Sequence, residues 1–440
     1  MKRFFETISN IFKIEELRKR ILYTLLLVVV YRLGCYVVIP GIDASQLTAL
    51  QSKSADGILG LLDMFSGGAF GHASIFAVGV MPYISASIVI QLLGVMFPFF
   101  QRLQREGESG RRKMNQYTRY LTILILAIQG PAYMASLRTT LPAEAFVLSG
   151  AWYGIFATLV LIGGTMFVMW LGERITDRGI GNGISLIIMV GIIARLPMAL
   201  RIELTQRFSQ TSGGGVLMLI VELLILFFVF VATIALVQAV RKVPVQYAKR
   251  IVGNKQYGGV RQYIPLKVNA AGVMPIIFAQ ALMIVPVMFS GFNATKGLAA
   301  VFSNTTGFWY NFVFALLVVL FTYFYTAITV NPTNMAEEMK KNGGFIPGCK
   351  PGKKTADYID AIMSRITLPG SIFLAIVAIL PAFARLLGVN NQFASFYGGT
   401  SLLILVGVIL DTLQHIESHL LMRHYDGLMK TGRLSGRSGM

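Results

Sequence analysis

Long apolar stretches recur along the chain and are separated by polar segments. A helix needs about 20 mostly apolar residues to cross the hydrocarbon core of a bilayer. Ten stretches fit this requirement: Ile21–Ile39, Ala73–Phe97, Tyr117–Leu137, Trp152–Leu171, Ile184–Leu200, Val216–Val240, Val268–Ser290, Phe308–Val330, Ile366–Leu387 and Gly398–His419. The pattern therefore predicts an all-α polytopic membrane protein with about ten transmembrane helices.

The composition agrees with a chain that folds in lipid. Hydrophobic residues make up 55% of the 440 residues and charged residues only 13%, whereas soluble domains are about 25% charged. The two cysteines, Cys35 and Cys349, imply no disulfide framework. The basic N-terminus resembles the start of a signal peptide, but no small-residue cleavage pattern follows the first apolar stretch, so we expect a retained anchor.

The basic residues predict the orientation. The net charge is +19, and 31 of the 39 Lys and Arg residues fall on one side of the membrane if the N-terminus is cytoplasmic and the spans alternate. Lys and Arg collect in the cytoplasmic loops of membrane proteins. We therefore expect both termini to be cytoplasmic.

Five spans precede the segment 201–215 and five follow it. Because each half then holds an odd number of spans, the halves have opposite orientations, as in many membrane transport proteins with a central pathway. The prediction is an N-terminal half of residues 1–208 and a C-terminal half of residues 209–440, with a hinge at Ser209–Gly215. It rests on topology, since we identify no clear sequence similarity between the halves.

Two predicted cytoplasmic loops are long. The loop 241–267 carries seven basic residues and no acids, and the loop 331–365 mixes both charges. A solvated loop would account for the charge but not for the length, since a simple connection needs only a few residues. We expect these loops to extend well beyond the membrane and to bind a partner.

The predicted spans contain few ionisable residues. Arg32, Glu222 and Asp411 are the clearest, and such groups often mark ion pathways. Arg32 is expected to extend outward to the interface, and Asp411 lies towards the cytoplasmic end of the last span. Glu222 has no evident role, and we expect it to be paired or to reach the interface.

The segment Gly57–His72 is apolar but too short to span the membrane. Glycines separate it from the next span, which is typical of a re-entrant segment, and such backbone is tolerated only inside protein or along a cavity. An interfacial helix on the outer face is the alternative. Pro82 and Pro275 fall inside two predicted spans, where each should remove a backbone hydrogen bond and permit bending.

No pattern indicates catalysis. His415 and His419 have a spacing that can bind a metal, but no third ligand is evident. There is also no phosphate-binding glycine loop and no nucleophile–base arrangement. We therefore predict no metal site, no cofactor and no enzyme activity.

Ordered blocks of sequence resemble the bacterial SecY family from the first span to the last. They are Asp63-Met-Phe-Ser-Gly-Gly-Ala, Ser74-Ile-Phe-Ala, Met81-Pro-Tyr-Ile-Ser-Ala-Ser-Ile, Glu106-Gly-Glu-Ser-Gly-Arg-Arg-Lys, Gln116-Tyr-Thr-Arg-Tyr, Met169-Trp-Leu-Gly-Glu, Arg178-Gly-Ile-Gly-Asn-Gly-Ile-Ser, Tyr247-Ala-Lys-Arg, Pro265-Leu-Lys-Val-Asn, Pro351-Gly-Lys-Lys-Thr and Gly398-Gly-Thr-Ser-Leu-Leu-Ile.

The resemblance implies the pore subunit of a protein-conducting channel, with two inverted five-helix halves around a central pore. It implies a plug at about residues 60–71, including Asp63, Met64, Phe65, Ser66, Gly67 and Gly68. It also implies an apolar pore ring of Val80, Ile84, Ile188, Ile277 and Ile404. Val80 departs mildly from the family, where many members have Ile.

The resemblance further implies a lateral gate between the second and seventh helices, with Ser85, Gln129, Asn182, Pro82 and Pro275 as contributors. It implies docking of the ribosome and of the motor ATPase SecA on the two long loops, through Lys249, Arg250, Lys255 and Lys350. Lys350 stands where the family usually has Arg. Lysine keeps the charge but lacks the planar guanidinium that makes bidentate contacts. Other implied partners are SecE, SecG, signal sequences, nascent polypeptides and lipids, in the bacterial inner (plasma) membrane.

Two other functions remain as alternatives. A secondary solute transporter with inverted repeats should show acidic residues near the middle of the bilayer and short cytoplasmic loops, and this sequence has few of the former and lacks the latter. A membrane enzyme is the less favoured alternative, because no catalytic constellation is evident.

Overall fold

The computed structural model describes the chain except for residues 1–13, 48–59, 61, 62, 64, 149, 210–214, 248, 249, 253, 254, 258–260, 289–305 and 432–440. The hinge predicted at Ser209–Gly215 and the plug residue Met64 therefore lie wholly or mainly outside the described residues. Helices dominate the described part of the chain.

The ten predicted spans correspond to ten helices. They are α2 (Glu15–Gly34), α5 (Met81–Met96), α7 (Glu108–Thr140), α8 (Ala151–Arg178), α9 (Gly183–Phe208), α10 (Gly215–Gln238), α11 (Met274–Met288), α13 (Phe308–Thr329), α15 (Lys353–Leu386) and α17 (Gly399–Thr431). Shorter helices are α6 (Pro98–Arg105), α14 (Pro332–Lys341) and α16 (Asn391–Ala394), and 3-10 turns include η2 (Ala143–Ala145) and η4 (Ser395–Tyr397).

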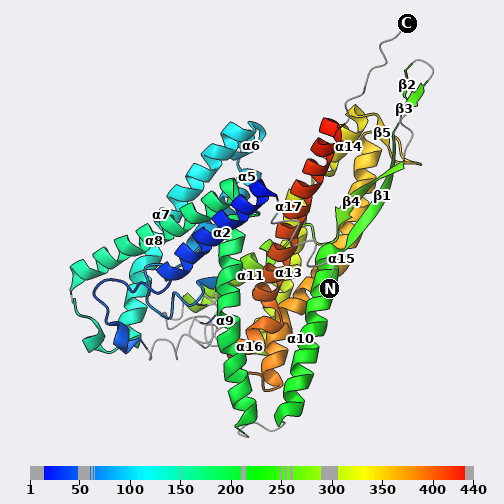
Figure 1. Ribbon diagram of the computed structural model, residues 1–440. Coiled ribbons are helices and arrows are strands. Elements are labelled where there is room, and N and C mark those ends of the chain that lie inside the picture. Colours follow the sequence, from blue (N-terminus) through cyan, green and yellow to red (C-terminus); the bar gives the residue numbers. More distant parts are fainter. Residues whose placement is uncertain are drawn as a thin grey trace.

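The helices form two groups that meet at α9. Figure 1 shows α2 and α5 to α8 on one side and α10, α15 and α17 on the other, with the end of α9 and the start of α10 at the lower end of the view. α9 contacts α8 in the first group and both α10 and α17 in the second. The arrangement is the one predicted, two five-helix halves on either side of a central region.

Length and composition alone identify fewer spans. Seven described helices are long and apolar enough to cross a membrane, or eight if α5 and α6, bent by 102° relative to each other, count as one span. Of the remaining two, α2 begins with a charged turn that contains Glu15 and Glu16, and α11 has only 15 residues. The helix α2 is therefore shifted towards the N-terminus relative to the predicted span, and α11 is shorter than the apolar pattern suggested.

Many large apolar side chains face outward. Leu217 on α10 is 75% exposed and Phe227 on the same helix is 64% exposed. In water such a surface would be unfavourable by about 25 cal/mol for each Å². A surface of this kind fits a lipid environment, and the chain is a multi-pass membrane protein.

The first long basic loop is a β-hairpin rather than an irregular loop. β1 (Val240–Tyr247) pairs antiparallel with β4 (Arg261–Lys267), and β5 (Gly344–Phe345) adds to the other edge of β1. Near the tip, β2 (Arg250–Val252) pairs with β3 (Lys255–Tyr257). The hairpin lies at the upper end of the molecule in Figure 1, with α6 and α14.

A small apolar core holds the hairpin to the second predicted loop. Val243 and Leu266 of the hairpin pack with Met339 of α14 and Met363 of α15 in one buried cluster. The segment 331–365 is thus α14, β5 and the first turns of α15, and it is joined to the hairpin. The two regions predicted separately form one structured unit.

Two details of the predicted spans were wrong. α2 ends at Gly34, and the chain that follows runs as an irregular segment in which Val38 bridges Ser74, so the helix does not reach Ile39. Pro82 lies in the first turn of α5, as Pro275 does in α11. A first-turn N–H has no partner within its own helix, so neither proline removes a helical hydrogen bond or favours bending there.

Candidate functional site

The five predicted ring residues are all buried in the structure. Val80, Ile84, Ile188, Ile277 and Ile404 are between 3% and 8% exposed and belong to one buried apolar cluster. They come from the start of α5, from α9, from α11 and from α17. Phe65 of the predicted plug belongs to the same cluster. Four helices from both halves and the short segment therefore contribute side chains to one apolar core, the apolar centre, to which residues of α2, α8, α13 and α15 also belong.

The helices α5 and α11 begin with the same local structure. Gly79-Val80-Met81-Pro82 precedes Ile84 by two residues, and Gly272-Val273-Met274-Pro275 precedes Ile277 in the same way. Gly79 and Gly272 have φ angles of 60° and 64°, a conformation that glycine adopts without strain. This six-residue repeat places one ring isoleucine in each half, and comparing the two halves of the sequence would have revealed it.

The segment predicted as a plug is buried in the protein. Asp63 and Ala69 are fully buried, and Phe65, Ser66 and Phe70 are nearly so. An interfacial helix would expose one face, so this burial favours the re-entrant alternative for the described residues. Gly67 and Gly68 have φ angles of 65° and 93°, which let the chain turn sharply inside the protein.

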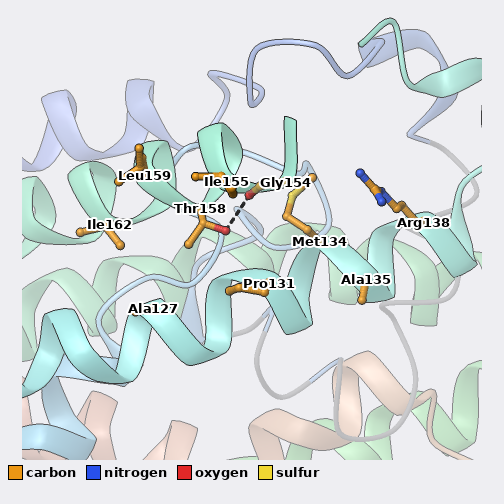
Figure 2. A pocket seen from close by; sticks show the side chains of 10 residues that line it. All are labelled: Ala127, Pro131, Met134, Ala135, Arg138, Gly154, Ile155, Thr158, Leu159 and Ile162. Carbon is orange, nitrogen blue, oxygen red and sulfur yellow. Dashed lines mark hydrogen bonds between the residues drawn. The ribbon is translucent and has the colours of Figure 1, made fainter. Parts of the chain in front are cut away.

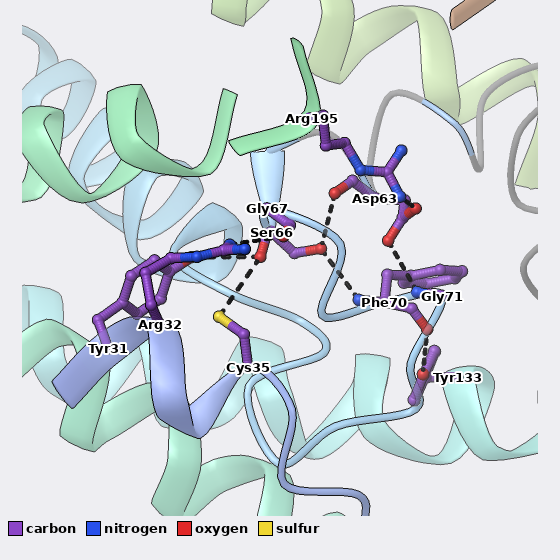
Figure 3. A network of polar contacts seen from close by, with 10 residues as sticks. All are labelled: Tyr31, Arg32, Cys35, Asp63, Ser66, Gly67, Phe70, Gly71, Tyr133 and Arg195. Carbon is purple, nitrogen blue, oxygen red and sulfur yellow. Dashed lines mark hydrogen bonds and ion pairs between the residues drawn. The ribbon is translucent and has the colours of Figure 1, made fainter. Parts of the chain in front are cut away.

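Polar groups from three helices hold this segment (Figure 3). From α2, Tyr31 donates a hydrogen bond to the Ser66 carbonyl at 3.2 Å. From α7, Tyr133 donates to the Phe70 carbonyl at 3.0 Å. From α9, Arg195 forms an ion pair with Asp63. Buried backbone carbonyls need hydrogen-bond donors. The two tyrosines supply donors to carbonyls of this segment in place of helical hydrogen bonds.

Arg32 does not extend to the interface as predicted. Its Nη1 donates to the Gly67 carbonyl at 2.8 Å, so the guanidinium points towards the plug segment. The guanidinium of Arg32 thus has a hydrogen-bond partner within the protein, the Gly67 carbonyl.

The predicted gate residues lie on different elements. Ser85 is half-buried on α5, Gln129 is exposed on α7, and Asn182 caps α9 by accepting a hydrogen bond from the Ser185 amide at 3.3 Å. The sequence analysis missed a polar contact between the halves. Tyr325 of α13 donates a hydrogen bond to Oε1 of Gln91 on α5, at 3.4 Å.

Glu222 is paired, as one of the two expectations held. It lies on α10, nearly fully buried, and forms an ion pair with Arg207 of α9. Arg207 also contacts Glu203 one turn earlier at 2.9 Å and donates to the Gly388 carbonyl at 3.0 Å. Because Arg207 lies beyond the predicted end of its span, the apolar pattern did not indicate this cluster at the α9–α10 junction.

Three of the four predicted docking residues lie on the structured unit formed by the hairpin 240–267 and the segment 331–365, the hairpin unit. Lys249 is outside the described residues, Arg250 begins β2 and Lys255 begins β3. Lys350 is exposed just before α15, and its carbonyl accepts a hydrogen bond from the Thr355 hydroxyl at 3.0 Å.

The Nε2 atom of His415 lies 3.9 Å from the Oδ2 atom of Asp411, one turn earlier on α17.

One cavity in the described residues lies away from this centre. It is an open groove of about 720 Å³ between α7 and α8 (Figure 2). Its walls are mostly apolar, and Arg138 lies near one end. Thr158 donates its hydroxyl hydrogen bond to the Gly154 carbonyl at 2.8 Å, so this side chain offers little to a polar ligand. The groove faces outward and takes no part in the apolar centre.

Comparisons with known proteins agree with this geometry. The SecY family profile matches residues 74–413. The chain is 46% identical to "Protein translocase subunit SecY" of Halalkalibacterium halodurans over 435 residues, which cover 97% of this chain and 100% of that relative. It is 44% identical to the protein of the same name from Streptomyces scabiei, covering 96% of this chain and 99% of that relative.

A solved structure described as "The structure of a protein conducting channel" has the same fold. Its TM-score is 0.64 at 16% sequence identity, and the match covers 92% of this chain and 93% of that one. The family profile and the two relatives extend over most of the sequence, including the segments that build the apolar centre. On this evidence the chain belongs to the SecY family.

Proposed function

We propose that this chain forms the central pore of a bacterial protein translocase, which moves secretory proteins across the inner membrane and releases membrane proteins sideways into lipid. The similar proteins are translocase subunits, and solute transport has no support among them. The observation that carries the proposal is the apolar centre, to which five aliphatic side chains from four helices and Phe65 of the buried segment all belong.

An aliphatic ring suits a channel for polypeptides. A narrow apolar constriction excludes ions by dewetting. Aliphatic side chains also offer no hydrogen bonds that could hold a passing chain of arbitrary sequence. The proposed ring consists of Val80, Ile84, Ile188, Ile277 and Ile404. The ring can therefore seal around a moving polypeptide without binding it, and it lies between the halves 1–208 and 209–440.

The segment of about residues 60–71 acts as the plug of the closed channel. The burial of its described residues, with Phe65 in the same apolar core as the predicted ring residues, supports this role. The contacts that hold it are hydrogen bonds to its carbonyls and one ion pair, which water can replace when it moves away. Its displacement opens the outer side of the ring.

The seam between α5 on one side and α11 and α13 on the other acts as the lateral gate. Few polar contacts bridge it in the described residues, and the Gln91–Tyr325 hydrogen bond is long. Opening of the seam lets an apolar segment sample lipid, where signal sequences and membrane anchors partition by their own hydrophobicity. The residues that border this gate are Ser85, Pro82, Pro275, Gln129 and Asn182.

The hairpin unit docks the partners that drive transport. Its basic residues suit ribosomal RNA, and the ribosome and SecA supply the energy, together with the proton-motive force. Lys249, Arg250, Lys255 and Lys350 are the proposed contacts. SecE and SecG complete the complex, and both termini of this chain are cytoplasmic.

Reconstitution tests the proposal. The chain is purified with SecE and SecG, inserted into vesicles, and supplied with SecA, ATP and a secretory precursor. We expect the precursor to become protected from protease, and we expect protection to disappear when its signal sequence is deleted. Uptake of small solutes without precursor protection would contradict the proposal and favour a transporter.

A further inference from the structure

Asp63 is the charged residue of the plug segment, and its carboxylate is fully buried. Oδ1 accepts a hydrogen bond from the Gly71 amide at 2.7 Å. Oδ2 forms an ion pair with Arg195 and has no hydrogen-bond donor from another described residue. A buried carboxylate without a counter-charge is strongly unfavourable. Arg195 therefore determines whether Asp63 can remain charged in this position.

Arg195 belongs to the face of α9 that receives the plug. Ile188, Gly191 and Arg195 follow one another at helical spacing, so they lie along one side of the helix. Ile188 joins the apolar ring, Gly191 touches the plug backbone, and Arg195 pairs with Asp63. The ion pair thus lies about two turns of α9, on the order of 10 Å, from the ring.

The other described contacts of the plug are of a different kind. Tyr31, Arg32 and Tyr133 donate to backbone carbonyls, and water can satisfy those carbonyls after the plug leaves. The Asp63–Arg195 contact joins two opposite charges, one on the moving segment and one on a membrane helix. It favours the closed state by an amount that depends on both side chains being present.

We propose that the Asp63–Arg195 ion pair latches the plug and sets how strongly a signal sequence must bind before the channel opens. This inference rests on the proposed function. A signal sequence shifts the closed–open equilibrium only by its differential affinity for the open state. A latch that stabilises the closed state therefore raises the affinity required, and Arg195 is a positioning residue that determines selectivity for signal sequences.

The test compares two precursors in the complete translocase, one with an intact signal sequence and one with a signal sequence shortened by several apolar residues. We expect Arg195→Gln and Asp63→Asn each to raise translocation of the defective precursor at least about tenfold, since loss of one member of a buried pair is strongly destabilising. Asp63→Asn keeps the acceptor for the Gly71 amide. Arg201→Gln, an exposed arginine on the same helix, is the matched control and should change nothing.

A double variant separates a latch from two unrelated effects. In Asp63→Asn/Arg195→Gln no unpaired charge remains, so the increase should be smaller than the product of the two single increases. Arg195→Lys keeps the charge and should retain most of the discrimination. Single increases that multiply in the double variant would overturn the latch. So would two single variants that translocate the intact precursor normally but still reject the defective one. Loss of all translocation in the unaltered complex would instead contradict the proposed function.

Discussion

Gly67 of the plug segment and Gly191 of α9 lie against each other with no side chain between them. A Cβ atom built on Gly67 would lie 2.7 Å from the Gly191 Cα, and one built on Gly191 would lie 3.1 Å from the Gly67 Cα. Contacts this short require the backbone to move. The contact at this point is therefore between two backbones, and it depends on both residues being glycine.

Gly191→Val should displace the plug. Gly191 is helical, so the substitution adds no left-handed strain, and the new side chain must push the segment that contains Gly67. We expect a measurable ion leak through the resting channel in planar bilayers. Gly163→Val on α8 is the control, because a Cβ there meets no atom within 4 Å. An equal leak in both variants would show that the contact does not seal the channel.

The charge cluster at the junction of α9 and α10 should contribute strongly to stability. Arg207→Met leaves Glu203 and Glu222 buried without their counter-charge, so we expect the free energy of unfolding to fall by about 3–5 kcal/mol. Glu222→Gln removes one carboxylate while Arg207 keeps Glu203, and its cost should be clearly smaller. Denaturant unfolding of the purified protein in detergent measures both. Equal losses would contradict the assignment of Arg207 as the shared partner.

The Gln91–Tyr325 hydrogen bond should favour the closed seam. Its loss in Tyr325→Phe removes about 1 kcal/mol of net stabilisation, or about fivefold in the opening equilibrium. Insertion of a weakly apolar membrane anchor into lipid should rise by that factor. Tyr323→Phe on the same helix is the control. If both variants insert the anchor equally well, this bond has no role at the seam.

Docking through the hairpin unit should depend on salt. Replacing Lys249, Arg250 and Lys255 by Glu should weaken ribosome binding, and it should lower the slope of log K against log salt by about two units if each residue neutralises one phosphate of single-stranded RNA. Lys350→Arg should strengthen binding, because guanidinium contacts phosphate with two parallel hydrogen bonds. Sedimentation of ribosomes with the purified complex measures both effects. An unchanged slope in the triple variant would exclude the hairpin as the RNA contact.

Apolar periodicity was enough to locate the spans, because each span buries its backbone hydrogen bonds within itself. It could not find helix ends that tertiary contacts determine. The chain after Gly34 leaves the helix and bridges Ser74, and α9 continues to Phe208 because Arg207 finds acidic partners inside the protein. Both outcomes depend on residues distant in sequence.

The site residues divide in the same way, into those that could be identified from the sequence and those that depend on distant contacts. The resemblance to SecY supplied the five ring residues, which on their own sequence pattern could not be distinguished from core packing. The role of Arg32 was mispredicted, because the Gly67 carbonyl that it reaches is 35 residues away. The β1–β4 hairpin was missed, since its long basic sequence is typical of a solvated loop and its apolar partners lie on α14 and α15.

Photo-crosslinking from Ile277 tests the central claim most directly. A photoreactive residue replaces Ile277, a ribosome is stalled on a secretory chain engaged with the membrane, and the sample is irradiated. We predict adducts between this position and the translocating chain, with the same result from Ile84 and none from the outward-facing Leu217. Adducts should vanish when the signal sequence is deleted. No adduct from Ile277 or Ile84 in an engaged complex would contradict the assignment of the apolar centre as the conduit.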